Sequence, residues 1–406
     1  MGTLKAISLF TGAGGLDYGF EAAGFETAVA VEMEPAFCAT LRANRPWPVL
    51  QADINTVSTA QILKTGGLST GEADVLIGGP PCQPFSKSGY WASGDSRRLL
   101  DPRSSTLGAY MRVLREAQPR AFLLENVEGL GFRGKDEGLQ LIMSTLADIN
   151  RQHGAHYSTR IAVVNAADYG VPQMRRRVLI VGSRDGAVFK FPKPTHAEDP
   201  QGRQRPYATA WDALHDLPDV HDPTLALKGK WADLLPSIPE GMNYLWHTDR
   251  GGGLPLFGWR RRFWCFLLKL AKERPAWTIQ AQPGPATGPF HWSNRRLSMR
   301  ELARLQTFPD DVDVLGGIAV VHKQLGNAVP SLLAEVMARE IRSQLLGSRV
   351  AGQPRLAVRR ATLAPSPGAV ARVPAKYLRL QGDHSAHPGT GQGYGALARR
   401  RGTMAA

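Results

Sequence analysis

The sequence has few cysteines and no long hydrophobic segment. Its three cysteines, Cys38, Cys82 and Cys265, are scattered over 406 residues without the close pairs of a zinc site, so neither disulfides nor a bound metal are predicted. No stretch is apolar for long enough to span a membrane, and the N-terminus lacks a charged segment followed by an apolar one. We therefore expect a cytoplasmic protein with reduced thiols and no membrane association.

Acidic residues are scarce toward the C-terminus. The formal net charge is +14, and from residue 346 onward ten basic residues face the single acid Asp383, so this tail holds nine of the fourteen charges. A positive charge of this size indicates a polyanionic partner, most simply nucleic acid. Because residues 346–406 are rich in Ala, Gly, Pro and Arg without an apolar period, we expect a disordered tail that either grips phosphates non-specifically or is dispensable.

Short apolar runs alternate with amphipathic stretches over residues 4–183, which is typical of a βαβ domain. The predicted strands are residues 5–10, 27–31, 48–50, 73–77, 120–124, 158–164 and 178–182, and the predicted helices are residues 16–23, 107–118 and 139–151. Four of these strands end in a polar or reactive group. In open α/β sheets, ligands bind at the carboxyl ends of the strands, so these groups are candidates for a site.

A glycine-rich loop follows the first strand. It contains Gly12, Gly14 and Gly15, and Glu32 lies about 20 residues further on, as expected of an acid that binds ribose hydroxyls. Asp17 stands where a dinucleotide fingerprint would have its third glycine, so the pyrophosphate signature is incomplete. The pattern favours a nucleoside ligand without phosphates, such as S-adenosylmethionine, and the alternative is a tight turn without function.

A cysteine follows the fourth predicted strand. The run 73–77 leads into Gly78-Gly79-Pro80-Pro81-Cys82-Gln83-Pro84-Phe85-Ser86, where glycines and prolines stop both strand pairing and helix formation. Cys82 is thus expected on stiff backbone at the carboxyl edge of the sheet, where a chemical role is favoured. The alternative is a cysteine packed under a turn.

Together with several further motifs, these segments resemble the DNA (cytosine-5)-methyltransferase family. The resemblance covers residues 4–345, and the motifs occur in the family's usual order. They are residues 8–15, 78–86, Glu125-Asn126-Val127, the run 165–177 that ends Gln173-Met174-Arg175-Arg176-Arg177, the segments 296–301 and 305–309, and residues 323–330. So many motifs in order make a purely structural role for Cys82 remote.

The resemblance implies a catalytic role for four residues. Cys82 would add as a thiolate to carbon 6 of cytosine, which activates carbon 5 for methylation, and Glu125 would bind the exocyclic amine and ring nitrogen 3. Arg175 would reach the carbonyl oxygen of the cytosine, and Arg177 would support the site near the nucleophile. Because the two arginines alternate along the chain, an extended backbone projects both to the same side.

The resemblance also implies a pocket for S-adenosylmethionine. Its floor would be Phe10 and the backbone of Gly12, Ala13, Gly14 and Gly15, and Glu32 would hold the ribose hydroxyls. Asp53 and Ile54 would read the adenine edge, Met33 and Pro80 would line apolar walls, and Asn327 and Val329 would complete the pocket from the far end of the chain. One departure is Ser8, where many relatives carry aspartate.

The resemblance predicts two domains. A Rossmann-like catalytic and cofactor-binding domain would comprise residues 1–185 and 295–345, and a smaller, irregular target recognition domain would comprise residues 186–294. Loops such as 251–253 and 278–294 are candidates for base readout, and the apolar run 263–270 for a small core.

The predicted function is transfer of a methyl group to carbon 5 of a cytosine flipped out of duplex DNA within a specific sequence. We expect a monomer, with a restriction endonuclease of the same specificity as a possible companion. The alternatives are a tRNA cytosine-5 methyltransferase and, with less support, a non-catalytic DNA-binding regulator or a nucleotide-dependent oxidoreductase. The recognition sequence cannot be predicted from the chain.

Overall fold

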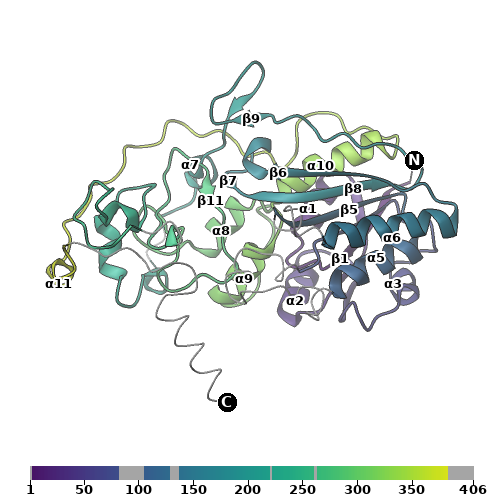
Figure 1. Cartoon of the computed structure of the whole chain (residues 1–406), viewed down its shortest axis with the longest axis horizontal. Coiled ribbons are helices and arrows are strands. Elements are labelled where there is room, and N and C mark those ends of the chain that lie inside the picture. Colours follow the sequence, from purple (N-terminus) through teal and green to yellow (C-terminus); the bar gives the residue numbers. More distant parts are fainter. Residues whose placement is uncertain (1, 82–104, 129–136, 220–221, 260–262, 383–406) are drawn as a thin grey trace, which may run out of the picture. The chain divides into compact units, whose positions relative to one another are not determined.

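The chain forms two compact units, whose segments alternate along the sequence. The computed structural model describes residues 2–81, 105–128, 137–219, 222–259 and 263–382 (Figure 1). Unit 1 contains residues 1–218, 275–282 and 298–362, and unit 2 contains residues 219–274, 283–297 and those from 363 onward. Cys82 and most of its loop lie outside the described residues.

Seven strands form the central sheet of unit 1, in the order β3-β2-β1-β4-β5-β8-β6. They are β1 (Leu4–Leu9), β2 (Phe25–Glu32), β3 (Val49–Gln51), β4 (Val75–Gly78), β5 (Ala121–Val127), β6 (Ser158–Asn165) and β8 (Arg176–Ser183). Neighbouring strands are parallel, except that β8 runs antiparallel to β5 and β6. The predicted α/β class is confirmed, and each of the seven predicted strands is present.

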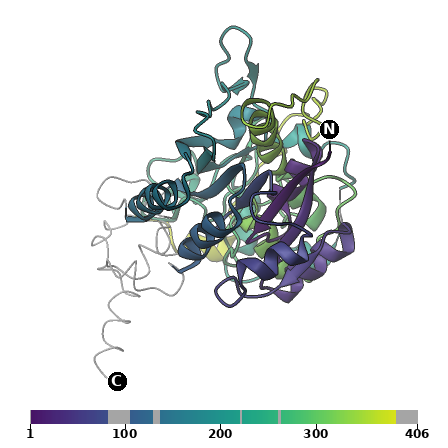
Figure 2. The ribbon, with the colours of Figure 1, turned by 90° about the vertical axis from the view of Figure 1, so that its right-hand side faces the viewer.

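Helices lie on both sides of this sheet (Figure 2). The helices of unit 1 are α1 (Gly15–Ala22), α2 (Pro35–Asn44), α3 (Thr59–Thr65), α5 (Ser105–Ala117), α6 (Glu137–His153), α7 (Ala210–Leu214), α8 (Met299–Leu305), α9 (Ile318–Asn327) and α10 (Ser331–Gln344). Among the described helices, none is long and apolar enough to cross a membrane.

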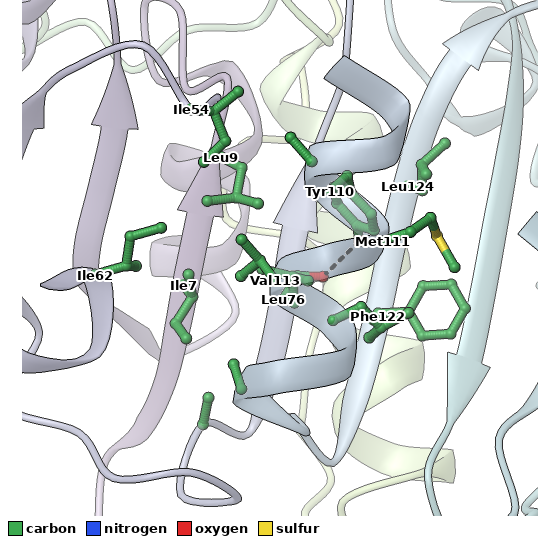
Figure 3. Packing of buried hydrophobic residues seen from close by; sticks show 14 of the residues in the cluster. Ile7, Leu9, Ile54, Ile62, Leu76, Tyr110, Met111, Val113, Phe122 and Leu124 are labelled. Atoms are coloured by element: carbon green, nitrogen blue, oxygen red, sulfur yellow. Dashed lines mark hydrogen bonds between the residues drawn. The ribbon is translucent and has the colours of Figure 1, made fainter. Parts of the chain in front are cut away.

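Each face of the sheet buries its own hydrophobic core. Along β5, Phe122 and Leu124 belong to one core and Ala121 and Leu123 to the other, because successive side chains of a strand point to opposite faces. Helices α3, α5 and α6 contribute to the first core, which Figure 3 shows, and α1 and α10 contribute to the second. Burial on both faces explains why these strands are continuous apolar runs in the sequence.

The parallel register brings the ends of four strands to the same level. Leu9 of β1 pairs with Gly78 of β4 and with Val31 of β2, and Gly78 pairs with Leu124 of β5. The next residues along these strands are Phe10, Gly79, Glu32 and Glu125. The candidate residues of several motifs therefore emerge together at the carboxyl edge of the sheet.

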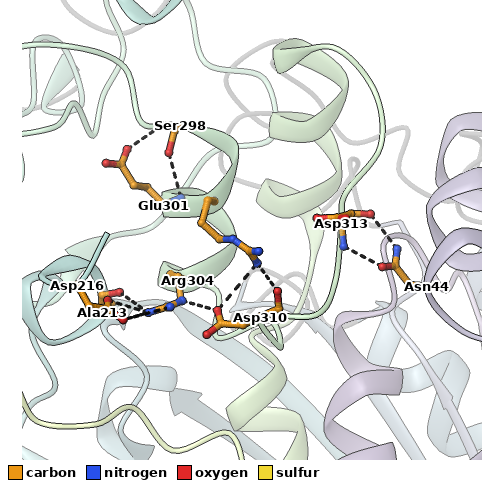
Figure 4. A network of polar contacts seen from close by, with 9 residues as sticks. Asn44, Ala213, Asp216, Ser298, Glu301, Arg304, Asp310 and Asp313 are labelled. Atoms are coloured by element: carbon orange, nitrogen blue, oxygen red, sulfur yellow. Dashed lines mark hydrogen bonds and ion pairs between the residues drawn. The ribbon is translucent and has the colours of Figure 1, made fainter. Parts of the chain in front are cut away.

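Polar contacts fix the helices that follow the second segment of unit 2. Helix α8 begins with a capping box, in which Ser298 and Glu301 each accept a hydrogen bond from the other's backbone N–H. Arg304 of α8 pairs with Asp216 at 3.1 Å and also with Asp310 (Figure 4). The contact with Asp216 lies within unit 1, whose first segment extends to residue 218, whereas we expected the second domain to begin at residue 186.

Unit 2 has little regular secondary structure in its described part. Its core contains Leu234, Leu235, Ile238, Tyr244 and Phe290. The predicted core run 263–270 contributes Leu267 to this cluster, while Phe263 at the start of the run is exposed. The remaining described strands, all in unit 1, are β7 (Gln173–Met174), β9 (His196–Ala197), β10 (Arg205–Pro206) and β11 (Ala276–Trp277), and the remaining described α-helix is α11 (Ala375–Leu378) of unit 2.

Residues 346–382 are held by specific contacts, in contrast to the disordered tail that we expected. The backbone N–H groups of residues 355 and 356 donate to the buried Glu335 carboxylate at 2.6 and 2.8 Å. The Arg360 guanidinium donates to Asp212 at 2.9 Å, and Tyr377 is buried in the core of unit 2. Buried carboxylates need hydrogen-bond donors, and this part of the tail supplies them. Residues 383–406 lie outside the described part of the chain.

The crossing of α1 and α10 generates a stability prediction. A Cβ atom on Gly19 would lie 2.4 Å from the Ser331 carbonyl oxygen and 2.4 Å from the Ala334 Cβ. We expect Gly19→Ala to lower the free energy of unfolding by about 2 kcal/mol, since overpacking outweighs the gain in helix propensity. Gly108→Ala on α5 is the matched control, because a Cβ atom at this position would meet nothing within 4 Å, and it should stabilise by about 0.5–1 kcal/mol. Urea unfolding of both variants measures this, and equal effects would contradict the prediction.

Candidate active site

The glycine loop turns sharply between β1 and α1. Phe10, Gly12 and Gly14 have φ values of 55°, 60° and 87°, and the left-handed conformation at the two glycine positions is one that side chains disfavour. A Cβ atom on Gly15 would lie 2.3 Å from the carbonyl oxygen of Val329. Only glycine therefore allows the loop to contact this residue, and the structure brings together two predicted segments that are more than 300 residues apart.

Glu32 is tied to the glycine loop at the end of β2. Its carboxylate accepts hydrogen bonds from the backbone N–H groups of Gly12, Met33 and Glu34, each at 2.8 Å. Burial raises the pKa of the carboxyl group, and the three hydrogen bonds oppose this shift. A carboxylate has about four lone-pair sites, so these contacts with described residues leave one for a ligand hydroxyl.

The other predicted cofactor residues differ in exposure. Ile54 is buried, and Phe10 packs against the same core cluster. Pro80 is also buried. Asp53, Asn327 and Met33 are exposed, with Met33 at 60%, which is unusually high for a large apolar side chain. Exposed carboxyl and amide groups beside apolar surface and bare glycine backbone suit a ligand with an adenosine moiety and an apolar methyl-bearing group.

A buried carboxyl group under the glycine loop was not predicted. Asp17 of α1 accepts hydrogen bonds from the hydroxyls of Ser8 at 3.1 Å and Thr27 at 3.2 Å. Ser8 also shares a 3.1 Å hydrogen bond with Thr11. Asp17 thus anchors the base of the loop through Ser8. The signal was the acid in place of a third glycine, which we interpreted only as a missing phosphate contact.

Glu125 lies beside the backbone that leads to Cys82. A Cβ atom on Gly79 would be 2.9 Å from Glu125 Oε2, and the Asn126 side chain donates to the Pro80 carbonyl at 3.3 Å. Arg177 Nε contacts Glu125 Oε1 at 2.8 Å, and only 14% and 11% of the two side chains are exposed. Glu125 and Arg177 therefore form an ion pair at the carboxyl edge of the sheet. Glu125 lies beside Gly79 and Asn126 contacts Pro80, and these two residues precede Cys82 by three and two positions.

Arg175 contacts the backbone of two distant segments. Its side chain is buried, and its guanidinium donates to the carbonyls of Ile279 at 3.3 Å and Gly326 at 2.8 Å. Burial lowers the pKa of this guanidinium well below its usual range; Arg177 adds to the shift and Glu125 opposes it. Of the two arginines, Arg177 contacts Glu125, whereas the Arg175 guanidinium contacts the two backbone carbonyls. Partners more than 100 residues away give no signal in the local sequence.

Solved structures identify the fold of the chain. A protein encoded within an Escherichia coli prophage aligns with a TM-score of 0.63 and 23% identity, over 85% of this chain and all of the other. The Entamoeba histolytica methyltransferase EhMeth aligns with a TM-score of 0.58 and 15% identity, over 85% of this chain and 99% of the other. The fold is the Rossmann-like fold of S-adenosylmethionine-dependent methyltransferases.

The chain belongs to the C-5 cytosine-specific DNA methylase family, whose model matches residues 4–343. It is 42% identical to the Type II methyltransferase M.SacI of Streptomyces achromogenes over 372 residues, which cover 84% of this chain and 93% of the relative. It is also 34% identical to M1.HphI of Haemophilus parahaemolyticus, over 84% of this chain and 87% of the relative. The protein is a DNA (cytosine-5)-methyltransferase, and S-adenosylmethionine is its methyl donor.

The buried Asp17 generates a pH prediction. Burial raises the pKa of its carboxyl group from 3.8 to about 7, against the hydrogen bonds from Ser8 and Thr27. The unfolded chain therefore loses this proton at a lower pH than the folded protein does. As a result, the contribution of Asp17 to the free energy of unfolding is largest in acid and falls as the pH rises from about 4 to 7. In Asp17→Asn this loss is absent. Relative to wild type, the variant should gain about 2–3 kcal/mol in the free energy of unfolding between pH 5 and pH 8.

Denaturant unfolding at the two pH values measures this difference. Asp148→Asn, which removes a surface carboxylate on α6, controls for the loss of one charge. If the difference between Asp17→Asn and wild type stays constant across this range, Asp17 does not titrate as predicted.

Proposed function

We propose that the protein methylates a cytosine flipped out of duplex DNA through a covalent adduct with Cys82. The observation that supports this is the Glu125–Arg177 pair at the sheet edge, with the Glu125 carboxylate 2.9 Å from a Cβ position on Gly79. Gly79 and Pro80 lead directly to Cys82, so the nucleophile would enter from the same edge. A stacked base shields carbon 6, which is why the target must leave the helix.

In this mechanism the Cys82 thiolate adds to carbon 6 and the ring electrons move to carbon 5. Carbon 5 would then take the methyl group from the sulfonium of S-adenosylmethionine, with S-adenosylhomocysteine as the leaving group. Loss of the proton from carbon 5 and elimination of the thiolate restore the aromatic ring and release the enzyme. Glu125 would hold the exocyclic amine and ring nitrogen 3, where charge develops as the thiolate adds.

Arg177 is the better candidate for the carbonyl oxygen of the cytosine. It contacts Glu125 directly, whereas the Arg175 guanidinium donates to two backbone carbonyls. We assign Arg175 to support of the loop.

The cofactor assignments rest on the glycine loop and its partners. Gly12 and Glu32 are joined by a 2.8 Å hydrogen bond, and Gly15 contacts Val329. The remaining assignments are the backbone of Ala13 and Gly14, the apolar side chains of Phe10, Met33, Ile54 and Pro80, and the polar groups of Asp53 and Asn327. These residues supply apolar surface, hydrogen-bond acceptors and close backbone approach, as an adenosine-bearing methyl donor requires.

Sequence recognition is assigned to unit 2, where irregular loops carry basic and aromatic side chains. Arg250 lies over the Trp259 ring at 4.4 Å, a pairing that suits contact with a base or phosphate. The Type II names of the relatives support a role in modification that protects sites from a restriction endonuclease. We propose such a companion enzyme of shared specificity, and a monomeric methyltransferase.

The nucleophile assignment predicts that Cys82→Ala transfers no methyl label to duplex DNA, with a fall of at least about 1,000-fold from wild type. Wild-type protein should also form an adduct with duplex DNA containing 5-fluorocytosine that survives denaturation, because loss of the carbon 5 proton is blocked, whereas Cys82→Ala should not. Bisulfite sequencing of DNA from cells that express wild type identifies the modified base and its sequence context.

Cys38→Ala is the control, because Cys38 is a buried thiol whose pKa burial raises to about 11. It should keep its activity. Full activity of Cys82→Ala would end the covalent mechanism, and label accepted by tRNA rather than duplex DNA would favour the tRNA alternative.

The arginine assignment predicts a contrast between neighbouring residues. Arg177→Lys keeps the charge but loses the planar guanidinium beside Glu125, and should lower kcat by about 10- to 100-fold. Arg176→Lys is the matched control, since Arg176 is 63% exposed and pairs with Glu128 on the surface; its effect should stay within about threefold. Single-turnover methyl transfer measures both. Equal effects of the two substitutions would refute the assignment of Arg177.

A further inference from the structure

An eight-residue excursion joins the two units in an unusual way. Residues 275–282 belong to unit 1, but the residues on either side, up to Arg274 and from Pro283, belong to unit 2. The chain therefore leaves unit 2, passes through unit 1 and returns. The ends of the excursion are bonded covalently to unit 2, so any displacement of unit 2 must move or strain this segment.

One side of the excursion is fixed to the arginine loop. Strand β11 pairs in parallel with β7, and the two lie side by side in Figure 1. The Ala276 N–H donates to the Pro172 carbonyl at 2.8 Å, and the Thr278 hydroxyl donates to the Met174 carbonyl at 2.6 Å. Gln173 accepts from the Ile279 N–H at 3.1 Å. The three residues that precede Arg175 thus all contact this segment.

Its other side contacts the end of α9. A Cβ atom on Gly326 would lie 2.4 Å from the Cα of Ala281, so backbone packs directly on backbone. The Arg175 guanidinium bridges the Ile279 and Gly326 carbonyls. Asn327 and Val329, the proposed cofactor residues, follow immediately. The excursion is therefore held between the proposed base-binding loop and the proposed cofactor-binding turn.

A buried pair of glutamines completes this connection. Gln173 Nε2 donates to Gln306 Oε1 at 3.1 Å and to the Leu305 carbonyl at 3.2 Å, and Gln306 donates to the Leu325 carbonyl. Both glutamine side chains are fully buried. Because buried amides left unpaired are costly, the loop, the excursion and the end of α9 should move together rather than separately.

We propose that residues 275–282 couple DNA recognition by unit 2 to the position of the arginine loop, with Thr278 as a positioning residue. This inference rests on the proposed roles of unit 2 and of Arg177. Binding of the correct sequence by unit 2 fixes both ends of the excursion, and the excursion then sets the loop 172–177 beside Glu125. Weakening the contact between residues 275–282 and the loop 172–177 should lower the methylation rate on the correct DNA sequence. The rate on an incorrect sequence should fall less, because unit 2 does not bind that sequence in the way that positions the loop.

The test is Thr278→Val, which removes the hydroxyl and keeps the shape. Single-turnover methylation is measured on the duplex identified by bisulfite sequencing and on a duplex with one other base pair of that site replaced. We expect the rate on the correct duplex to fall about tenfold and the rate on the altered duplex to change less than about twofold, with the KM for S-adenosylmethionine unchanged. Thr278→Ser should restore the wild-type ratio of the two rates.

Thr65→Val at the end of α3 is the matched control, because it also removes a threonine hydroxyl that donates to a backbone carbonyl, at 2.9 Å. An equal fall on both duplexes, or an unchanged ratio, would overturn the coupling. The ratio of the rates on the two duplexes can be measured whenever the protein transfers methyl groups to DNA. It therefore tests the coupling whether or not Cys82 is the nucleophile. Loss of duplex binding by Thr278→Val with an unchanged rate ratio would also count against the coupling.

Discussion

The register between β1, β2, β4 and β5 is the constraint on which the candidate site depends. It sets the ends of four strands at one level, so that Phe10, Glu32, Gly79 and Glu125 emerge side by side. Alternate residues of these strands fill two different cores, and a slip of one residue would exchange the two faces. Burial on both faces thus fixes the level at which the polar groups meet, and the energy that holds the site together comes from hydrophobic packing.

Much of this arrangement was predictable because it is local in sequence. The apolar runs identify the strands, and the motifs lie where those runs end. Contacts between distant segments were not predictable. Alternation predicts only that Arg175 and Arg177 project to the same side, and it gives no sign that Arg175 contacts the carbonyls of Ile279 and Gly326 while Arg177 contacts Glu125. Asp17 was similarly hidden, since its partners Ser8 and Thr27 lie on two strands.

Composition misled us about the tail for a related reason. A segment rich in Ala, Gly, Pro and Arg cannot build a core of its own, and residues 346–382 do not. They are instead stabilised by acceptors on the folded units, above all the buried carboxylates of Glu335 and Asp212. Those carboxylates lie outside the tail, and without the tail they would be buried with fewer hydrogen bonds, so they favour its ordered position.

The alternation of segments also limits how such a protein can be rebuilt. Unit 2 is not one continuous insertion: it consists of three stretches, and each is separated from the next by residues that belong to unit 1. The counterpart of unit 2 from a relative could not be transplanted as a single cassette between two junctions. The graft would need to keep residues 275–282 of the recipient. These residues contact the recipient's own arginine loop, and the grafted stretches would be joined to their two ends.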